Sequence, residues 1–167
     1  IKQANQIKIN EIDFKIKGRD EKIKVFTTRP DTIFGVTYIV LAPEHALVRS
    51  LLNSAQNRSE IEQYIKDSRV KSEIDRTDAK TVKTGVELKG IKVINPANNE
   101  EVPIWIADYV LADYGTGAVM AVPAHDERDR QFAEKYNLEI REIKLQDKKE
   151  ITKIVGGKWV IKFKLRD

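Results

Sequence analysis

The sequence predicts an α+β fold with a β-barrel-like core and peripheral helices. Segments with strand patterns occur at both ends and in the middle of the chain, and three segments with helical spacing lie between them. Strands and helices do not alternate regularly, which argues against a sheet built from βαβ units. The length of 167 residues suits one domain, residues 1–167, without an internal repeat or a linker.

Eight segments are expected to be strands, because they alternate between apolar and polar residues or are apolar and β-branched throughout. They cover residues 7–17, 23–28, 35–42, 85–95, 101–106, 118–122, 138–145 and 159–165. The turn sequence Gly18-Arg19-Asp20 separates the first two, which should form a hairpin. Another strong turn signal, residues 95–99, connects the fourth and fifth.

Three helices are expected between the strands. The first follows Pro43, and apolar residues at helical spacing continue it. The second begins at Ser59, which forms a capping box with the glutamate three residues later. Residues 71–84 are polar and are expected to be irregular. The third helix begins at Asp126, a good N-cap residue, and runs to about Asn137.

The composition excludes several classes of site. The absence of cysteine rules out a disulfide scaffold, a cysteine-ligated metal site and a cysteine nucleophile. Two histidines are too few for a multi-histidine metal site, and without a phosphate loop or dinucleotide fingerprint no cofactor is expected. No apolar run approaches the roughly 20 residues of a membrane helix, and the first residues lack a signal-peptide core. A cytoplasmic protein without membrane contact is therefore expected.

The basic excess of the sequence is local. The net charge is +4, and residues 148–167 alone contribute +5. Such a segment can form a surface that contacts phosphates, or it can be a strand whose lysines face solvent. The segment by itself favours the solvated strand.

The first candidate functional segment is Thr27-Thr28-Arg29-Pro30-Asp31-Thr32, directly after a predicted strand. Threonine hydroxyls both donate and accept hydrogen bonds, and arginine can hold a phosphate or carboxylate with two hydrogen bonds. The alternative is a Pro-Asp turn whose side chains bond their own backbone. The residue chemistry supports both interpretations equally.

The second segment runs from Tyr114 to Asp129 and contains Gly115-Thr116-Gly117, a buried strand and two acids. Asp126 and Asp129 share one helix face, so both carboxylates can point past the end of the strand and bind an ammonium group or a metal ion. A metal ion is the less favoured ligand, because His125-Asp126-Glu127 lacks the i, i+4 spacing that puts two ligands on one helix face. Alternatively, Asp126 only caps the helix and Asp129 only complements the helix dipole. No Gly-x-Ser-x-Gly motif occurs, so a hydrolase built on this chain would have to activate water directly.

Both segments resemble the editing domain of leucyl-tRNA synthetases. The resemblance rests on Thr27–Tyr38 (TTRPDTIFGVTY) and on Tyr114–Asp129 (YGTGAVMAVPAHDERD), in the family's order. Isoleucine and valine editing domains share GTGAV and PAH but differ around residues 31–35 and at Met120. The paired-histidine ATP motif and the KMSKS loop of the synthetase core are absent. The resemblance therefore implies an inserted editing domain without the aminoacylation core.

The resemblance implies hydrolysis of wrongly charged leucine tRNA, with leucine excluded sterically. By carry-over, Thr32 is the wall that keeps leucine out, and its β-branched side chain is stiff enough for that role. Asp129 is implied to hold the α-ammonium group of the substrate, with Asp126 nearby. Met120 and Val122 are implied to line the pocket for the amino-acid side chain.

The same carry-over assigns the remaining contacts. Thr27, Thr28 and Arg29 are implied to contact the ester and the terminal adenosine and to orient water, and Tyr114 to pack near the adenosine. The implied partners are the aminoacylated 3′ end of tRNA and the rest of the synthetase. Two alternatives stay open: an editing domain with valine or isoleucine specificity, and a non-catalytic tRNA-binding module.

Overall fold

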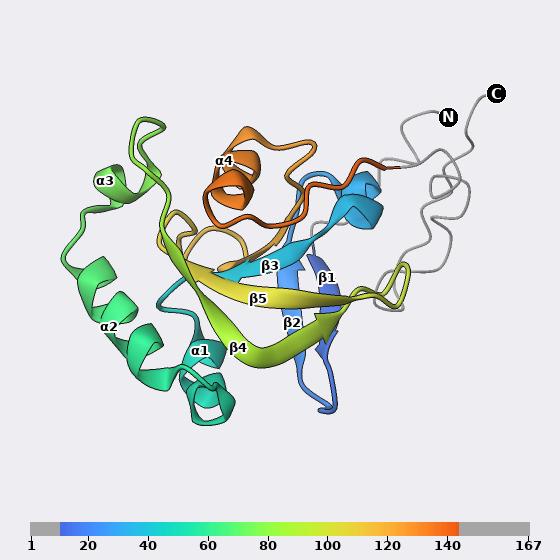
Figure 1. Ribbon diagram of the computed structural model, residues 1–167, viewed down its shortest axis with the longest axis horizontal. Coiled ribbons are helices and arrows are strands. Elements are labelled where there is room, and N and C mark those ends of the chain that lie inside the picture. The colour runs from blue at the N-terminus through green and yellow to red at the C-terminus, as the bar shows by residue number, and fades with distance from the viewer. Residues whose placement is uncertain (1–10, 144–167) are drawn as a thin grey trace.

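The computed structural model describes residues 11–143, and its centre is a closed β-barrel (Figure 1). The strands are β1 (Glu11–Ile16), β2 (Lys22–Phe26), β3 (Tyr38–Leu41), β4 (Gly85–Ile94), β5 (Glu101–Ala107) and β6 (Ala118–Ala121). Around the barrel they follow the order β1-β2-β6-β3-β5-β4. The predicted barrel-like α+β core is confirmed, and β1 and β2 form the expected antiparallel hairpin.

Helices surround this barrel. The α-helices are α1 (Ala46–Leu51), α2 (Arg58–Arg69), α3 (Glu73–Thr77) and α4 (Glu127–Lys135), and two 3₁₀ helices are η1 (Pro30–Gly35) and η2 (Leu52–Ser54). In Figure 1, α4 lies over β3 and β5, whereas α2 lies beside β4. No helix in this part of the chain is long and apolar enough to cross a membrane.

The core has two parts, one inside the barrel and one beneath α4. Strand β3 contributes to both, because successive side chains of a strand point to opposite faces. Ile39 and Leu41 belong to the barrel interior, whereas Tyr38 and Val40 belong to the second cluster. There Phe132 of α4 is fully buried and stacks on Tyr38, with ring centroids 5.5 Å apart. This aromatic packing fixes α4 against the barrel wall.

Strands β2 and β6 share fewer paired residues than any other two neighbouring strands of the described barrel. These two strands run parallel and pair only at Phe26 and Val119, whereas β3 and β6 are antiparallel and pair from Tyr38–Ala121 to Leu41–Ala118. Parallel strands end at the same edge of a sheet. The chain segments that follow β2 and β6 therefore leave the barrel side by side, although they are far apart in the sequence.

Three predictions of local structure are wrong in detail. Helix α2 has Asn57 rather than Ser59 at its N-cap. Residues 71–84, expected to be irregular, contain α3, whose N-cap Ser72 accepts a hydrogen bond from the backbone of Asp75 at 3.1 Å. The strand expected from residue 35 begins at Tyr38, because the preceding residues form η1.

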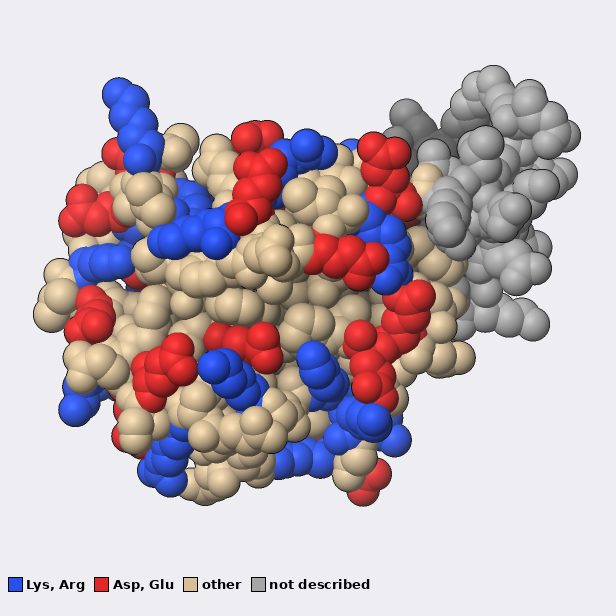
Figure 2. Space-filling model, in the orientation of Figure 1, with Lys and Arg blue, Asp and Glu red and all other residues tan. Residues whose placement is uncertain are grey.

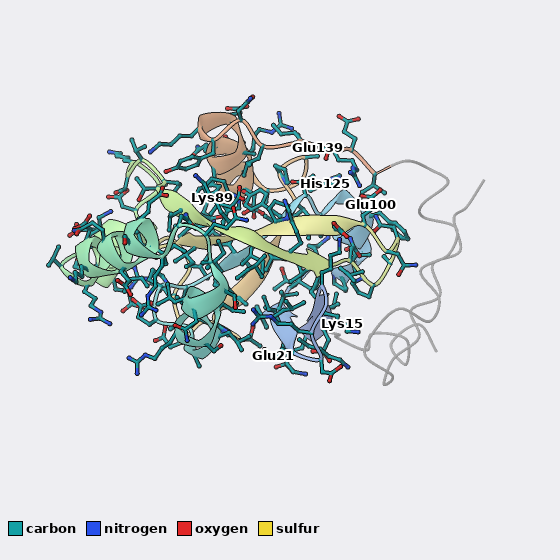
Figure 3. The ribbon with its side chains drawn as sticks, turned by 60° about the horizontal axis from the view of Figure 1, so that its bottom comes forward. Lys15, Glu21, Lys89, Glu100, His125 and Glu139 are labelled. Atoms are coloured by element: carbon teal, nitrogen blue, oxygen red, sulfur yellow. The ribbon has the colours of Figure 1, made fainter. Side chains whose placement is uncertain are left out.

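The strand expected over 138–145 is also wrong for its described part, residues 138–143, which pair with no strand of the barrel. Side-chain bonds hold this segment instead: Arg141 bonds Glu139 at 3.0 Å and also Glu100 in the β4–β5 turn. Figure 3 shows Glu139 and Glu100 on the same side of the molecule. The strand expected at 159–165 and the basic segment 148–167 lie outside the described residues. On the face in Figure 2, acidic and basic side chains are interspersed.

Candidate active site

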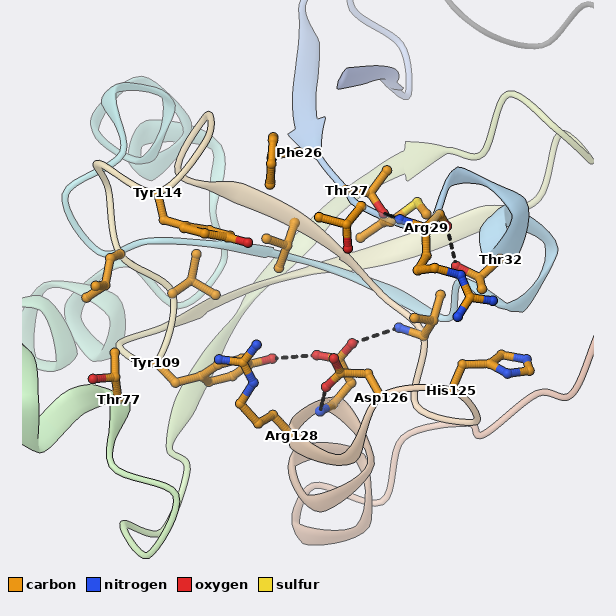
Figure 4. Close-up of a pocket in the computed structure, with 17 residues that line it drawn as sticks. Phe26, Thr27, Arg29, Thr32, Thr77, Tyr109, Tyr114, His125, Asp126 and Arg128 are labelled. Carbon is orange, nitrogen blue, oxygen red and sulfur yellow. Dashed lines mark hydrogen bonds between the residues drawn. The ribbon is translucent and has the colours of Figure 1, made fainter. Parts of the chain in front are cut away.

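A cavity of about 330 Å³ opens at the barrel edge where β2 and β6 end. Every side chain that the sequence analysis selected lines it: Thr27, Thr28, Arg29, Thr32, Tyr114, Met120, Val122, Asp126 and Asp129. Figure 4 shows Thr27 across the cavity from Asp126. The parallel seam between β2 and β6 explains why the two segments meet.

The threonine segment is held by bonds to its own backbone. The Thr32 hydroxyl donates to the carbonyl oxygen of Arg29 at 2.7 Å, and the Thr27 hydroxyl accepts from the Arg29 amide at 3.0 Å. Thr32 is 1% exposed, so its hydroxyl bond and its packing fix its rotamer. The segment is therefore both a turn whose side chains bond their own backbone and part of the cavity lining.

The Arg29 guanidinium is also held locally. It donates to both carboxylate oxygens of Asp31, at 3.0 and 2.9 Å. These hydrogen bonds lower the pKa of Asp31, so the carboxylate stays charged at neutral pH. Arg29 remains largely exposed at the cavity, where its outer face can meet a ligand.

The two acids of the second segment have different environments. Asp126 caps α4, because its side chain accepts a hydrogen bond from the Asp129 amide at 3.0 Å. Asp129 is only 7% exposed. One of its carboxylate oxygens accepts from the Val122 amide at 3.0 Å, and the other accepts from the Tyr109 hydroxyl at 3.2 Å. Asp129 therefore does more than complement the helix dipole.

Burial raises the pKa of Asp129 to about 7, and the neighbouring Asp126 charge adds to the rise. The hydrogen bonds from Val122 and Tyr109 favour the ionised form and oppose the rise. A cation that comes close to such a buried carboxyl group stabilises its ionised form. The cavity thus contains a buried carboxyl group whose ionised form a neighbouring cation would favour.

This raised pKa predicts a specific pH dependence of stability. Because the folded state holds the Asp129 proton more tightly than the unfolded chain, its contribution to stability is complete at low pH and is lost as pH rises through about 7. Between about pH 5 and pH 8, the free energy of unfolding should fall, relative to Asp129→Asn, by roughly 2 kcal/mol. Denaturant unfolding of both proteins at the two pH values measures this. Parallel pH dependences would contradict the buried, titrating carboxyl group.

The exposed rim of the cavity has an aromatic side. Tyr114 is 54% exposed and meets Phe26 edge to face, with ring centroids 5.2 Å apart. The Gly115 beside it has φ of 57°, and a Cβ there would overlap the Phe26 ring. Glycine at this position therefore lets the loop close over Phe26 and present the tyrosine ring at the rim.

Several lining residues were missed by the sequence analysis. The most informative are Thr77, Tyr109 and Arg128. Arg128 lies inside the second segment, Tyr114–Asp129, and its charge could have marked it as a candidate site residue. Thr77 and Tyr109 lie outside both segments, and only the folded barrel brings them to the cavity. Within residues 11–143, no group of three or more histidine or acidic side chains is arranged to hold a metal ion.

Two comparisons with known proteins identify the family of this chain. The family model described as "Leucyl-tRNA synthetase, editing domain" matches residues 6–159. A solved structure of an Agrobacterium radiobacter K84 agnB2 leucyl-tRNA synthetase, in a ternary complex with tRNA and LeuAMS, is similar with a TM-score of 0.69 and 38% identity. The match covers 80% of this chain and 16% of that enzyme's chain. The chain therefore belongs to the family of leucyl-tRNA synthetase editing domains.

Proposed function

We propose that this domain hydrolyses the ester bond of wrongly charged leucine tRNA and spares leucyl-tRNA. The observation that carries the proposal is the shared cavity, in which a rigid threonine and a buried carboxylate lie among apolar walls. Membership of the editing-domain family supports proofreading in general. The residue roles below are inferred from the geometry.

Asp129 is the proposed anchor for the substrate's α-ammonium group. The ammonium replaces the proton that the buried carboxyl group otherwise retains near neutral pH. Asp126 adds a second negative charge on the same helix face and strengthens the attraction. This ion pair places the α-carbon, and with it the side chain, at a fixed position in the cavity.

Thr32 is the proposed steric gate. Attractive contacts discriminate poorly between aliphatic side chains, at about 1–3 kcal/mol per methylene, so exclusion needs a clash. The Thr32 rotamer is fixed by its bond to Arg29, and Met120 and Val122 provide apolar walls. Such a cavity accepts norvaline or isoleucine and collides with the branched end of leucine.

The proposed reaction is direct attack by water. Water attacks the ester carbonyl carbon, the bond to the ribose oxygen breaks, and that oxygen takes up the proton. Thr27 and Thr28 offer hydroxyls that orient the water, and Arg29 offers a positive charge to the developing oxyanion. Tyr114 offers an exposed ring on which the terminal adenine stacks.

The proposed partners are the 3′ end of tRNA and the remainder of a synthetase. The similar synthetase was solved with tRNA, and the present chain matches a small share of its length. The basic residues 148–166 are a further proposed tRNA contact.

A deacylation assay of the 167-residue chain tests the function. Leucine tRNA charged with norvaline or isoleucine should lose its amino acid, whereas leucine tRNA charged with leucine should not. If the domain instead prefers valine tRNA charged with threonine, or isoleucine tRNA charged with valine, it is an editing domain with valine or isoleucine specificity. Binding of tRNA without ester hydrolysis would indicate a non-catalytic module and overturn the proposal.

A further inference from the structure

The Asp129 carboxylate is oriented by donors from two other parts of the barrel. The Val122 amide bonds one oxygen and the Tyr109 hydroxyl bonds the other. Rotation of the carboxylate about its terminal bond would break both hydrogen bonds. The remaining acceptor positions of the two oxygens therefore have a fixed direction at the cavity.

Tyr109 is a permanent donor in this arrangement. Burial raises the pKa of Tyr109 well above its usual value, and the Asp129 charge adds to the rise. The hydroxyl therefore keeps its proton at neutral pH. Its ring packs against Phe132 of α4, with centroids 5.6 Å apart, so the aromatic cluster holds the ring as well.

The backbone on both sides of Tyr109 is clamped by Arg76 of α3. The Arg76 guanidinium donates to the carbonyl oxygens of Asp108 at 2.6 Å and Val110 at 3.1 Å, so its bonds straddle the tyrosine. Glu44 holds the same guanidinium through two bonds of 2.6 and 3.2 Å. The Arg76 side chain is only 10% exposed. This arginine ties the loop after β5 to α3.

We propose that Tyr109 is a positioning residue for deacylation: its hydroxyl orients the Asp129 carboxylate for the substrate's ammonium group, and the Arg76 clamp holds Tyr109 in place. The proposal rests on the proposed role of Asp129 as the anchor. It extends the site to residues outside both sequence segments.

The groups that face Asp129 define what the hydroxyl controls. Asp126 and Arg128 come from α4, Tyr109 from the loop after β5, and Tyr38 from β3, while the Val122 amide follows β6. Tyr38 donates to the backbone carbonyl oxygen of Asp129 at 2.9 Å and not to its carboxylate. Removing the Tyr109 hydroxyl takes one donor from the ionised carboxylate, so the pKa of Asp129 rises further.

The test compares Tyr109→Phe with Tyr136→Phe by the pH profile of kcat/KM for norvalyl-tRNA. In Tyr109→Phe, the acid limb should move up by about one pH unit, which is a loss of about tenfold near pH 6 and a smaller loss near pH 8. KM should rise more than kcat falls, because the anchor acts on binding. Tyr136→Phe removes a hydroxyl that accepts from the Gly85 amide at 2.9 Å and does not line the cavity, so it should leave the limb in place. An unmoved limb in Tyr109→Phe, or equal shifts in both variants, overturns the proposal.

A second readout separates this proposal from the proposed function. The ¹³C resonance of the Asp129 carboxyl group, followed by NMR against pH in the wild type and in Tyr109→Phe, needs no substrate. A higher titration midpoint in the variant supports the orienting bond, and identical midpoints refute it. If the wild type hydrolyses no mischarged tRNA, the proposed function fails, whatever the titration gives. Arg76→Lys keeps the charge but loses the planar fork that bonds the two carbonyls and Glu44 together, and it should shift the midpoint in the same direction by less.

Discussion

Replacing Asp129 by asparagine should lower the deacylation of norvalyl- and isoleucyl-tRNA by about 10²–10³-fold while the domain stays folded. The substrate's ammonium group would then enter a buried site without its counter-charge, a loss of about 3–4 kcal/mol. The fold survives because the asparagine oxygen can accept from the Val122 amide and its NH₂ can donate to the Tyr109 oxygen. Single-turnover deacylation and thermal unfolding measure the two effects.

Glu127→Gln is the matched control for this variant. Glu127 lies in the same first turn of α4 but does not line the cavity. Its neutralisation should leave deacylation unchanged. Near-normal turnover in Asp129→Asn would remove the anchor from the proposal, and an equal loss in Glu127→Gln would assign the effect to the general field at the helix start.

Thr32→Ala should make the domain hydrolyse leucyl-tRNA at a rate within about tenfold of its rate on norvalyl-tRNA. The substitution removes the methyl and hydroxyl groups that narrow the cavity, and leucine gains the space for its branched end. The rate on norvalyl-tRNA should change little, because the anchor at Asp129 is intact. Hydrolysis of leucyl-tRNA by the variant and by the wild type, at equal enzyme concentration, gives the result.

Thr32→Val separates bulk from hydrogen bonding at the gate. Valine has nearly the shape of threonine but cannot donate to the Arg29 carbonyl oxygen, which costs about 1 kcal/mol of stability. Leucyl-tRNA should therefore stay protected in Thr32→Val. If Thr32→Ala also spares leucine, the gate lies elsewhere. If Thr32→Val admits leucine, the hydroxyl bond and not the volume of the side chain sets the limit.

The two site segments were predictable because their signals are local. Each follows or contains a strand, and each concentrates hydroxyl and charged groups within a few residues. The N-cap role of Asp126 also follows from neighbouring residues alone, and the structure confirms it. Tyr109 and Arg76 carry no such signal. Their importance comes from contacts across the barrel with residues distant in the sequence.

The errors in local structure also have tertiary causes. Asn57 replaces Ser59 at the start of α2 because its side chain donates to the Glu87 carbonyl oxygen and accepts from the Lys89 amide in β4. The capping-box prediction uses only residues of the helix itself and ignores contacts with β4. Residues 138–143 alternate like a strand, but the closed barrel leaves no free edge with which they could pair. Periodicity predicts the strand pattern and gives no information about available partners.

The single residue pair between β2 and β6 has a consequence for how selectivity can change. Only Phe26 and Val119 pair between the two strands beside the cavity, and both line it, so we expect the volumes of their side chains to affect the width of its mouth. Substitutions at this rim can resize the opening while the other strand pairs preserve the scaffold. We therefore expect substitutions at this junction to change the proposed acyl preference while the barrel stays folded.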